Sequence, residues 1–140
     1  MLADLAAGVR SAAERAAKQL WSRTGLPEPW WNAEVWDADG RLLGIADCWL
    51  DEVAMVWEIE SSEWHLSPAD HEYTVRRAAQ FTAAGIVYVA SKPKMVLTDE
   101  AGVMATLRAV YTQAASRRRP PVTARRAAVA GKPPSRSHIA

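Results

Sequence analysis

Two apolar segments separated by a short acidic turn decide the fold expected for this chain. Residues 42–50 read LLGIADCWL, residues 51–52 are Asp-Glu, and residues 53–60 read VAMVWEIE. Apolar runs on both sides of a short turn are typical of an antiparallel hairpin. Working outward, residues 31–36 and the turn at residues 37–40 add a further strand, so the sequence predicts a three-stranded meander.

The hairpin is expected to gather acids on one face of the sheet. Because side chains alternate along a strand, Val56, Glu58 and Glu60 share a face. With residues 51–52 at the centre of the turn, Asp47 lies opposite Val56 and is a diagonal neighbour of Glu58, with Cα atoms about 7–8 Å apart. The two carboxylates can then converge on a single ion, with Glu60 one step further along.

A row of buried carboxylates is costly unless a cation neutralises it, because like charges and lost hydration both disfavour ionisation. Mg²⁺ prefers hard oxygen ligands, often one or two carboxylates completed by water and substrate phosphates. Asp47 and Glu58 are therefore candidate Mg²⁺ (or Mn²⁺) ligands, with the carbonyl of Ile59 as a further donor. The alternative is that these acids are ordinary charges on a solvated face of the meander.

The remaining segments predict an α/β protein with the order α-β-β-β-α-β-α and a mixed sheet flanked by helices. Apolar spacing indicates a helix over residues 2–22, with the alternative that a capping box at Ser11 and Glu14 starts it later. Residues 68–84 read as a second helix and residues 86–90 as a buried strand. A last helix is expected over about residues 99–115, capped by Thr98.

Composition places the chain among ordinary single-domain proteins. It has 140 residues, and its one cysteine, Cys48, excludes an intrachain disulfide and favours a reducing, cytoplasmic location. No apolar run approaches the roughly 20 residues of a membrane helix. Residues 116–140 hold seven Lys or Arg and no Asp or Glu, so we expect a folded domain over residues 1–115 and a basic, disordered tail over residues 116–140.

At these positions the chain resembles the PD-(D/E)XK, or restriction-endonuclease-like, superfamily, and in particular small actinobacterial proteins related to very-short-patch-repair endonucleases. The resemblance covers about residues 11–112, and it rests on the order of several short motifs. These are Ser11-Ala-Ala-Glu14-Arg15, Gly25-Leu26-Pro27-Glu28-Pro29, Asp39-Gly40-Arg41, Asp47 with Trp49, Trp57-Glu58-Ile59-Glu60, His65, and Arg76-Arg77.

The resemblance implies a restriction-endonuclease-like fold and Mg²⁺-dependent cleavage of DNA. Carried over residue by residue, Asp47 and Glu58 would bind the metal, and Glu14 would be the helix carboxylate that reaches the metal or its water. Glu60 stands where the superfamily pattern has Lys, so it would serve as a second-ion ligand or a general base. His65 would carry a proton or contact phosphate; the alternative for His65 is a loop residue that packs on Trp64.

Basic residues would hold the DNA backbone. Arg76 or Arg77 would contact a phosphate oxygen, the alternative being a solvated helix face. Arg117, Arg118 and Arg119 in the tail would add salt-sensitive affinity that does not depend on sequence.

Three functional hypotheses remain open from the sequence. The first is an endonuclease, for which the resemblance also allows a homodimer. The second is a catalytically inactive relative that binds DNA or a protein, because Lys is absent at position 60. The third is a truncated gene product, because many relatives carry an additional N-terminal domain.

Overall fold

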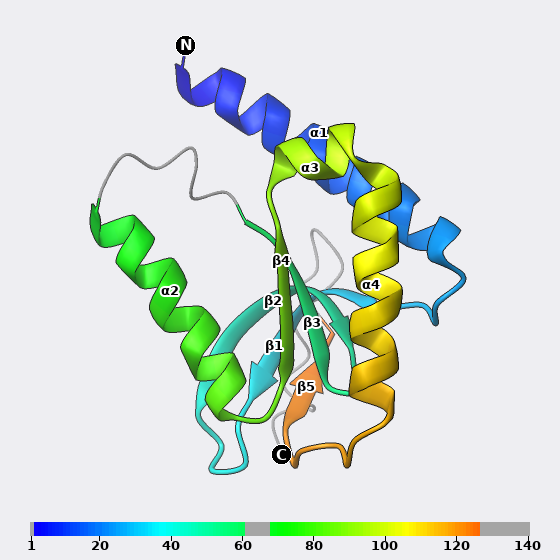
Figure 1. Cartoon of the computed structure of the whole chain (residues 1–140). Coiled ribbons are helices and arrows are strands. Elements are labelled where there is room, and N and C mark those ends of the chain that lie inside the picture. Colours follow the sequence, from blue (N-terminus) through cyan, green and yellow to red (C-terminus); the bar gives the residue numbers. More distant parts are fainter. Residues whose placement is uncertain (1, 61–67, 127–140) are drawn as a thin grey trace.

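The computed structural model describes residues 2–60 and 68–126 and is a mixed α/β protein (Figure 1). Its helices and strands follow one another in the order α1 (Leu2–Thr24), β1 (Trp30–Trp36), β2 (Leu42–Leu50), β3 (Met55–Ile59), α2 (Pro68–Ala83), β4 (Val87–Ser91), α3 (Pro93–Thr98), α4 (Glu100–Ala115) and β5 (Thr123–Arg125). None of the helices in these ranges is long and apolar enough to cross a membrane.

The five strands form one sheet in the order β4-β3-β2-β1-β5. The β1–β2–β3 meander is antiparallel, as the sequence predicts, and β4 joins β3 in parallel after the α2 crossover. The predicted mixed sheet of a meander plus a further strand is therefore confirmed. The finer prediction of a restriction-endonuclease topology stays a prediction.

Helices cover both faces of the sheet and give the protein two apolar cores. Helix α2 packs on one face, where Phe81 meets strand residues such as Val35, Trp49 and Val56. Helices α1, α3 and α4 cover the other face, as Figure 1 shows. The residues of this second core include Leu20, Trp21, Cys48, Met55, Trp57, Val96, Val103 and Leu107.

The β2–β3 hairpin differs from the prediction in its turn. Residues 51–54 all belong to the turn, and Ala54 has a left-handed φ of 51°. Cys48 therefore pairs with Trp57, a register displaced by two residues from the expected one. A shift of two keeps every side chain on its expected face.

The helix ends also differ in detail. Helix α1 is continuous from Leu2, so Ser11 does not start it. Asp99, not Thr98, caps α4, because its carboxylate accepts a hydrogen bond from the amide of Gly102 at 3.2 Å. Tyr73, whose spacing on α2 predicts an inward position, is 65% exposed.

The prediction that the chain lacks structure from residue 116 onward is wrong for residues 116–126. Val122 is buried, and β5 pairs with β1 through Glu34–Arg125, Val35–Ala124 and Trp36–Thr123. A three-residue strand is too short to show the alternation by which strands are recognised. Residues 127–140 lie outside the described residues.

Candidate functional site

Asp47 and Glu58 stand opposite each other where the β2–β3 ladder ends. The ladder pairs Cys48 with Trp57, and the next residues on the two strands are Asp47 and Glu58. The amide of Asp47 donates to Glu58 Oε2 at 2.8 Å, and the amide of Ile59 donates to Asp47 Oδ2 at 2.9 Å. Each carboxylate thus accepts a hydrogen bond from a backbone amide of the opposite strand. These two bonds replace the backbone-to-backbone bonds that would continue the β2–β3 ladder.

An irregularity in β1 lies beside this point. Asn32 falls opposite Asp47, between the pairs Trp31–Cys48 and Ala33–Ala46, and its φ is 59°. Asn is one of the few residues that tolerate this left-handed conformation. Trp31 packs with the core under α1, whereas Ala33 packs with the core under α2. The strand therefore changes faces at Asn32, directly beside the acid pair.

The two carboxyl groups are held in a weakly hydrated place. Glu58 is 5% exposed. Burial and then the negative charge of Asp47 raise the pKa of Glu58 to about 8, although Arg77 and the amide of Asp47 act in the opposite direction. Burial also raises the pKa of Asp47, against the lowering effect of the amide of Ile59. The pair therefore retains a proton near neutral pH.

Arg77 of α2 is the cation that contacts this pair. Its Nη2 atom lies 2.7 Å from Glu58 Oε1 and also donates to the carbonyl of Ile45. The guanidinium stacks over the ring of Phe81, 5.4 Å from the ring centroid. It packs over Gly44, since a Cβ added there would stand 3.5 Å from Arg77 Cζ, an ordinary contact distance. Arg77 Nε is buried and has no hydrogen-bond partner among the described residues.

A small pocket opens beside Asp47 on the side of α1. Its volume is about 40 Å³, the scale of one or two water molecules. Glu14, which the sequence singles out, lies here with Asp47 and Ile59. The pocket is lined by Glu14, Ala17, Lys18, Trp31, Asn32, Asp47 and Ile59. Sequence reasoning missed Lys18 and Asn32; the spacing of Glu14 and Lys18, one helical turn apart, was the available signal for Lys18.

Glu60 directly follows β3 and is half-buried. Its amide donates to the carbonyl of Ser91 at 2.8 Å, which extends the pairing with β4 by one bond. Tyr88 of β4 lies within the electrostatic influence of these acids. Burial, followed by the charge of Glu58, raises the pKa of Tyr88 to about 12, and the charges of Glu60 and Asp47 add smaller contributions. The charges of Glu58, Glu60 and Asp47 thus all act on the Tyr88 hydroxyl.

Two predicted residues do not join the site. Arg76 is exposed and pairs with Glu72, one turn earlier on α2, at 2.8 Å. It lies on a solvated helix face, which was the alternative interpretation. His65 lies outside the described residues.

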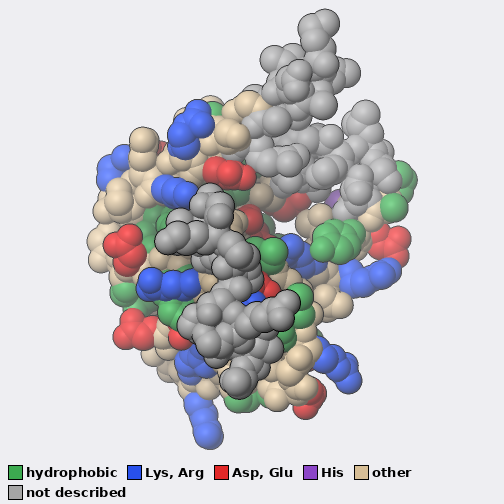
Figure 2. Space-filling view, turned by 180° about the vertical axis from the view of Figure 1, so that it is seen from behind, with side chains coloured by type: hydrophobic (Ala, Val, Ile, Leu, Met, Phe, Trp, Pro, Cys, Tyr) green, Lys and Arg blue, Asp and Glu red, His purple; other side chains and the backbone are tan. Residues whose placement is uncertain are grey.

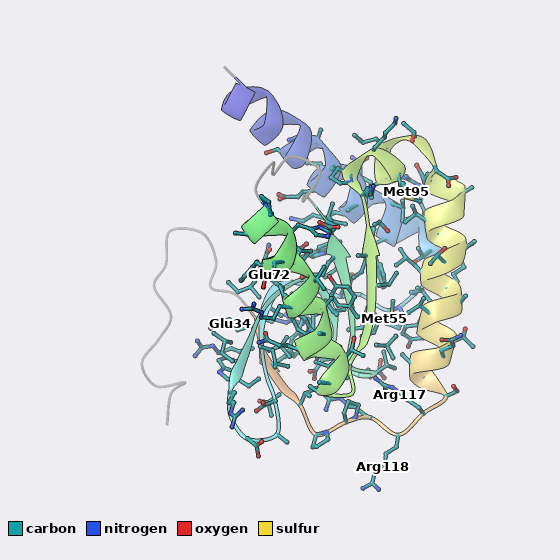
Figure 3. The ribbon with its side chains drawn as sticks, turned by 60° about the vertical axis from the view of Figure 1, so that its left-hand side comes forward. Glu34, Met55, Glu72, Met95, Arg117 and Arg118 are labelled. Carbon is teal, nitrogen blue, oxygen red and sulfur yellow. The ribbon has the colours of Figure 1, made fainter. Side chains whose placement is uncertain are left out.

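Of the three tail arginines assigned to DNA, two are engaged in the fold. Arg117 donates to carbonyls of Val53, Ala114, Ala54 and Gly85, and burial followed by the charge of Arg119 lowers its pKa. Figure 3 shows Arg117 directed into the body and Arg118 directed away from it.

Arg119 is held in a similar way. It donates to the carbonyls of Asp51, Pro120 and Val122 and pairs with the Asp51 carboxylate at 3.1 Å. On the face seen in Figure 2, the coloured basic and acidic side chains are interspersed, with no separate basic stripe. Of the three arginines, only the exposed Arg118 fits the predicted role of a free phosphate contact.

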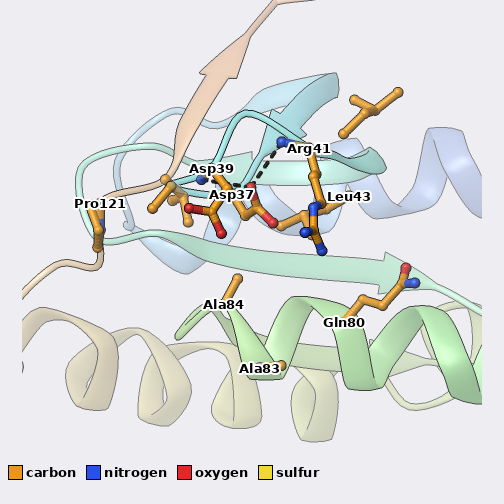
Figure 4. Close-up of a pocket in the computed structure, with 11 residues that line it drawn as sticks. Asp37, Asp39, Arg41, Leu43, Gln80, Ala83, Ala84 and Pro121 are labelled. Carbon is orange, nitrogen blue, oxygen red and sulfur yellow. Dashed lines mark hydrogen bonds between the residues drawn. The ribbon is translucent and has the colours of Figure 1, made fainter.

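A second, larger pocket of about 440 Å³ lies between the β1–β2 turn and the end of α2 (Figure 4). The Asp37 carboxylate stabilises the turn itself, since its Oδ1 accepts hydrogen bonds from the amides of Asp39 and Arg41. Arg41 and Gln80 line the pocket from opposite sides. The acid pair does not line this pocket.

Within residues 2–60 and 68–126, no three His, Cys, Asp or Glu side chains converge as a complete metal-binding group. Comparison with family models, curated proteins and solved structures finds no match to the chain. Any function must therefore be argued from the site itself.

Proposed function

We propose that this protein is a metal-dependent endonuclease that hydrolyses DNA phosphodiester bonds, with Asp47 and Glu58 as its metal ligands. The supporting observation is that two acids eleven residues apart lie against each other where the β2–β3 ladder ends, with Glu58 only 5% exposed. Burial raises the pKa of both acids, and the charge of Asp47 raises that of Glu58 further. A divalent cation would compensate for their negative charge at neutral pH.

The donor set suits Mg²⁺ or Mn²⁺ in chemistry. Asp47, Glu14 and Ile59 border one water-sized pocket, and Mg²⁺ needs only one or two carboxylates when water and phosphate complete its shell. Glu58 can coordinate the metal ion with both of its carboxylate oxygens only when Arg77 no longer pairs with Oε1. Oε2 keeps a lone pair beyond the one that accepts the Asp47 amide.

In this proposal the metal ligands hold the cation, and Glu60 is the general base of the hydrolysis. A bound cation supplies Lewis acidity toward the phosphate and lowers the pKa of water. Glu60 accepts the proton of the attacking water as that water bonds to phosphorus. The bond from phosphorus to the leaving oxygen then breaks, and this oxygen takes a proton from solvent.

Asp47→Asn and Glu58→Gln test the proposal, because they keep the shape of each side chain but remove its charge. We expect the wild type to bind Mn²⁺ in calorimetric titration and to nick supercoiled plasmid in Mg²⁺ or Mn²⁺. Each variant should lose at least about 100-fold in nicking rate. Metal binding should release protons near pH 7, because the pair must ionise fully.

Glu72→Gln is the matched control, since Glu72 is an exposed acid on α2 whose partner is Arg76. It should bind Mn²⁺ and nick DNA like the wild type. Equal nicking by the wild type and Asp47→Asn would remove the assignment of this site.

One observation favours the second hypothesis, an inactive relative that binds DNA or a protein. Arg77 already lies on Glu58 as an internal cation. If this pairing is permanent, the wild type binds DNA but shows neither Mn²⁺ binding nor nicking. Calorimetry with Mn²⁺ therefore separates the two functions before any substrate is known.

A further inference from the structure

The proposed centre has a surplus of negative charge. When metal binding ionises the pair, Glu14, Asp47, Glu58 and Glu60 carry four negative charges, Arg77 and the divalent cation carry three positive ones, and a phosphodiester adds another negative charge on binding. Arg77 offers little to a substrate, because it is bound to Glu58 and to the carbonyl of Ile45. An additional cation beside the pocket is therefore needed to hold the phosphate.

Lys18 is placed to provide that charge. It lines the same 40 Å³ pocket as Glu14 and Asp47 and follows Glu14 by one turn of α1. A Glu and a Lys at this spacing commonly pair on a helix, yet they form no ion pair among the described side chains. The Lys18 ammonium instead lies 5.7 Å from the centroid of the Trp31 ring.

Two features keep Lys18 in this position. Its helix is anchored in the core through neighbours such as Ala17 and Leu20, which are fully or almost fully buried. The Trp31 ring, itself part of the pocket wall, attracts the ammonium by its quadrupole. The Lys18 side chain is thus exposed at a pocket that Glu14 and Asp47 also line, and it pairs with no acid of residues 2–60 and 68–126.

We propose that Lys18 is a substrate-binding catalytic residue that contacts a non-bridging oxygen of the scissile phosphate, supplying the positive charge that Glu60 cannot. This inference rests on the proposed function. The Lys18 ammonium stabilises the charge that builds up on the phosphate oxygens as water attacks. The site therefore accepts phosphodiesters on the side of α1.

The first test does not depend on activity. The chain has four lysines, Lys18, Lys92, Lys94 and Lys132, so ¹³C-labelled lysine gives a small set of Cε signals in NMR. Adding Mg²⁺ should move the Lys18 signal, because a second cation then lies nearby. The Lys92 and Lys94 signals should not move, and Asp47→Asn should abolish the change. An unmoved Lys18 signal in protein that binds Mg²⁺ would overturn the inference.

The second test separates binding from turnover. Lys18→Ala should lower kcat for plasmid nicking by about 100-fold, while Mn²⁺ affinity stays equal or rises because a like charge is removed. Lys18→Arg should recover at least a tenth of the wild-type kcat. Arg15→Ala is the control, since Arg15 is exposed on α1 and does not line the pocket; it should keep the wild-type rate.

The outcomes distinguish this inference from the proposed function. If the wild type binds no Mn²⁺ and cuts no DNA, both proposals fail together. If the wild type is active and Lys18→Ala keeps more than a third of its kcat, only the role of Lys18 is wrong. A loss in Lys18→Ala that comes with lost Mn²⁺ binding or a lowered Tm would show a structural role and also overturn the inference.

Discussion

Glu58 occupies a position where its negative charge is disfavoured. It is 5% exposed and faces Asp47, and one cation, Arg77, lies on it. These surroundings raise its pKa to about 8 from an ordinary value of 4.5. Burial of a neutral carboxyl is tolerated far better than burial of a carboxylate, so the protonation state of this side chain is linked to folding.

The link predicts how stability depends on pH. A group whose pKa is higher in the folded state contributes stability in full below its unfolded pKa and loses it as pH rises through the folded pKa. From pH 4.5 to 8 and above, the wild type should therefore lose roughly 1–4 kcal/mol relative to Glu58→Gln, which cannot ionise. Urea unfolding of both proteins at pH 5, 7 and 9 measures this difference. Parallel curves for the two would show that Glu58 ionises normally.

Sequence pattern alone reached the acid pair at the residue scale but not its geometry. Alternation along the two strands was enough to place Asp47 and Glu58 on the same face of the sheet. An error of two residues in register leaves each side chain on its expected face. The direct opposition of the two acids depends on the four-residue turn at 51–54, with Ala54 at a φ of 51°. Ala54 carries no sequence signal for a left-handed conformation, and Asn32 carries only the general tolerance of Asn for it.

At the scale of elements, α2 reaches β2 at Gly44. The φ of Gly44 is 143°, and a Cβ added there would lie 3.5 Å from Arg77 Cζ. The backbone conformation favours glycine, whereas the space beside it would admit a Cβ at an ordinary contact distance. Arg77 thus packs against a residue of β2 while it pairs with Glu58 of β3, which explains why the motif Arg76-Arg77 could not reveal which arginine faces the site.

Gly44→Ala should therefore affect both stability and the acid pair. We expect a loss of roughly 1–3 kcal/mol in the free energy of unfolding from the strained backbone. Relief of this strain should shift the neighbouring carbonyl of Ile45, to which Arg77 donates, and so move Arg77 relative to Glu58. The pKa of Glu58 should then rise further, because Arg77 lowers it in the wild type. Chemical denaturation and a ¹³C NMR titration of the Glu58 carboxyl measure the two effects.

Gly40→Ala is the matched control for Gly44→Ala. Gly40 has a φ of 82° in the β1–β2 turn, and nothing lies within 4 Å of an added Cβ. It should cost about 1–2 kcal/mol in stability and leave the Glu58 titration unchanged. The same Glu58 titration in all three proteins would contradict the coupling between Gly44 and Arg77.

At the scale of the whole molecule, the basic residues that follow α4 join distant parts of the chain. The sequence predicted a disordered, DNA-binding tail because charge without periodicity is typical of solvated segments. Composition could not show that Arg117 finds carbonyl partners in the β2–β3 turn, in α4 and after α2. These carbonyls are distant in the sequence and come together only in the folded chain, so a local sequence pattern cannot predict the contacts.

Arg117→Met and Arg118→Met separate the structural role of these residues from a DNA-binding one. Arg117→Met removes the side-chain donor from the carbonyls of Val53 and Gly85, and one of two donors from that of Ala54, which keeps the Val87 amide. It should therefore lower the free energy of unfolding by roughly 1–3 kcal/mol. Arg118→Met should change it by less than about 0.5 kcal/mol, because its side chain is exposed. Urea unfolding measures both. If Arg117→Met weakens DNA binding but keeps full stability, Arg117 contacts DNA as the sequence predicted, and the carbonyl contacts do not stabilise the fold.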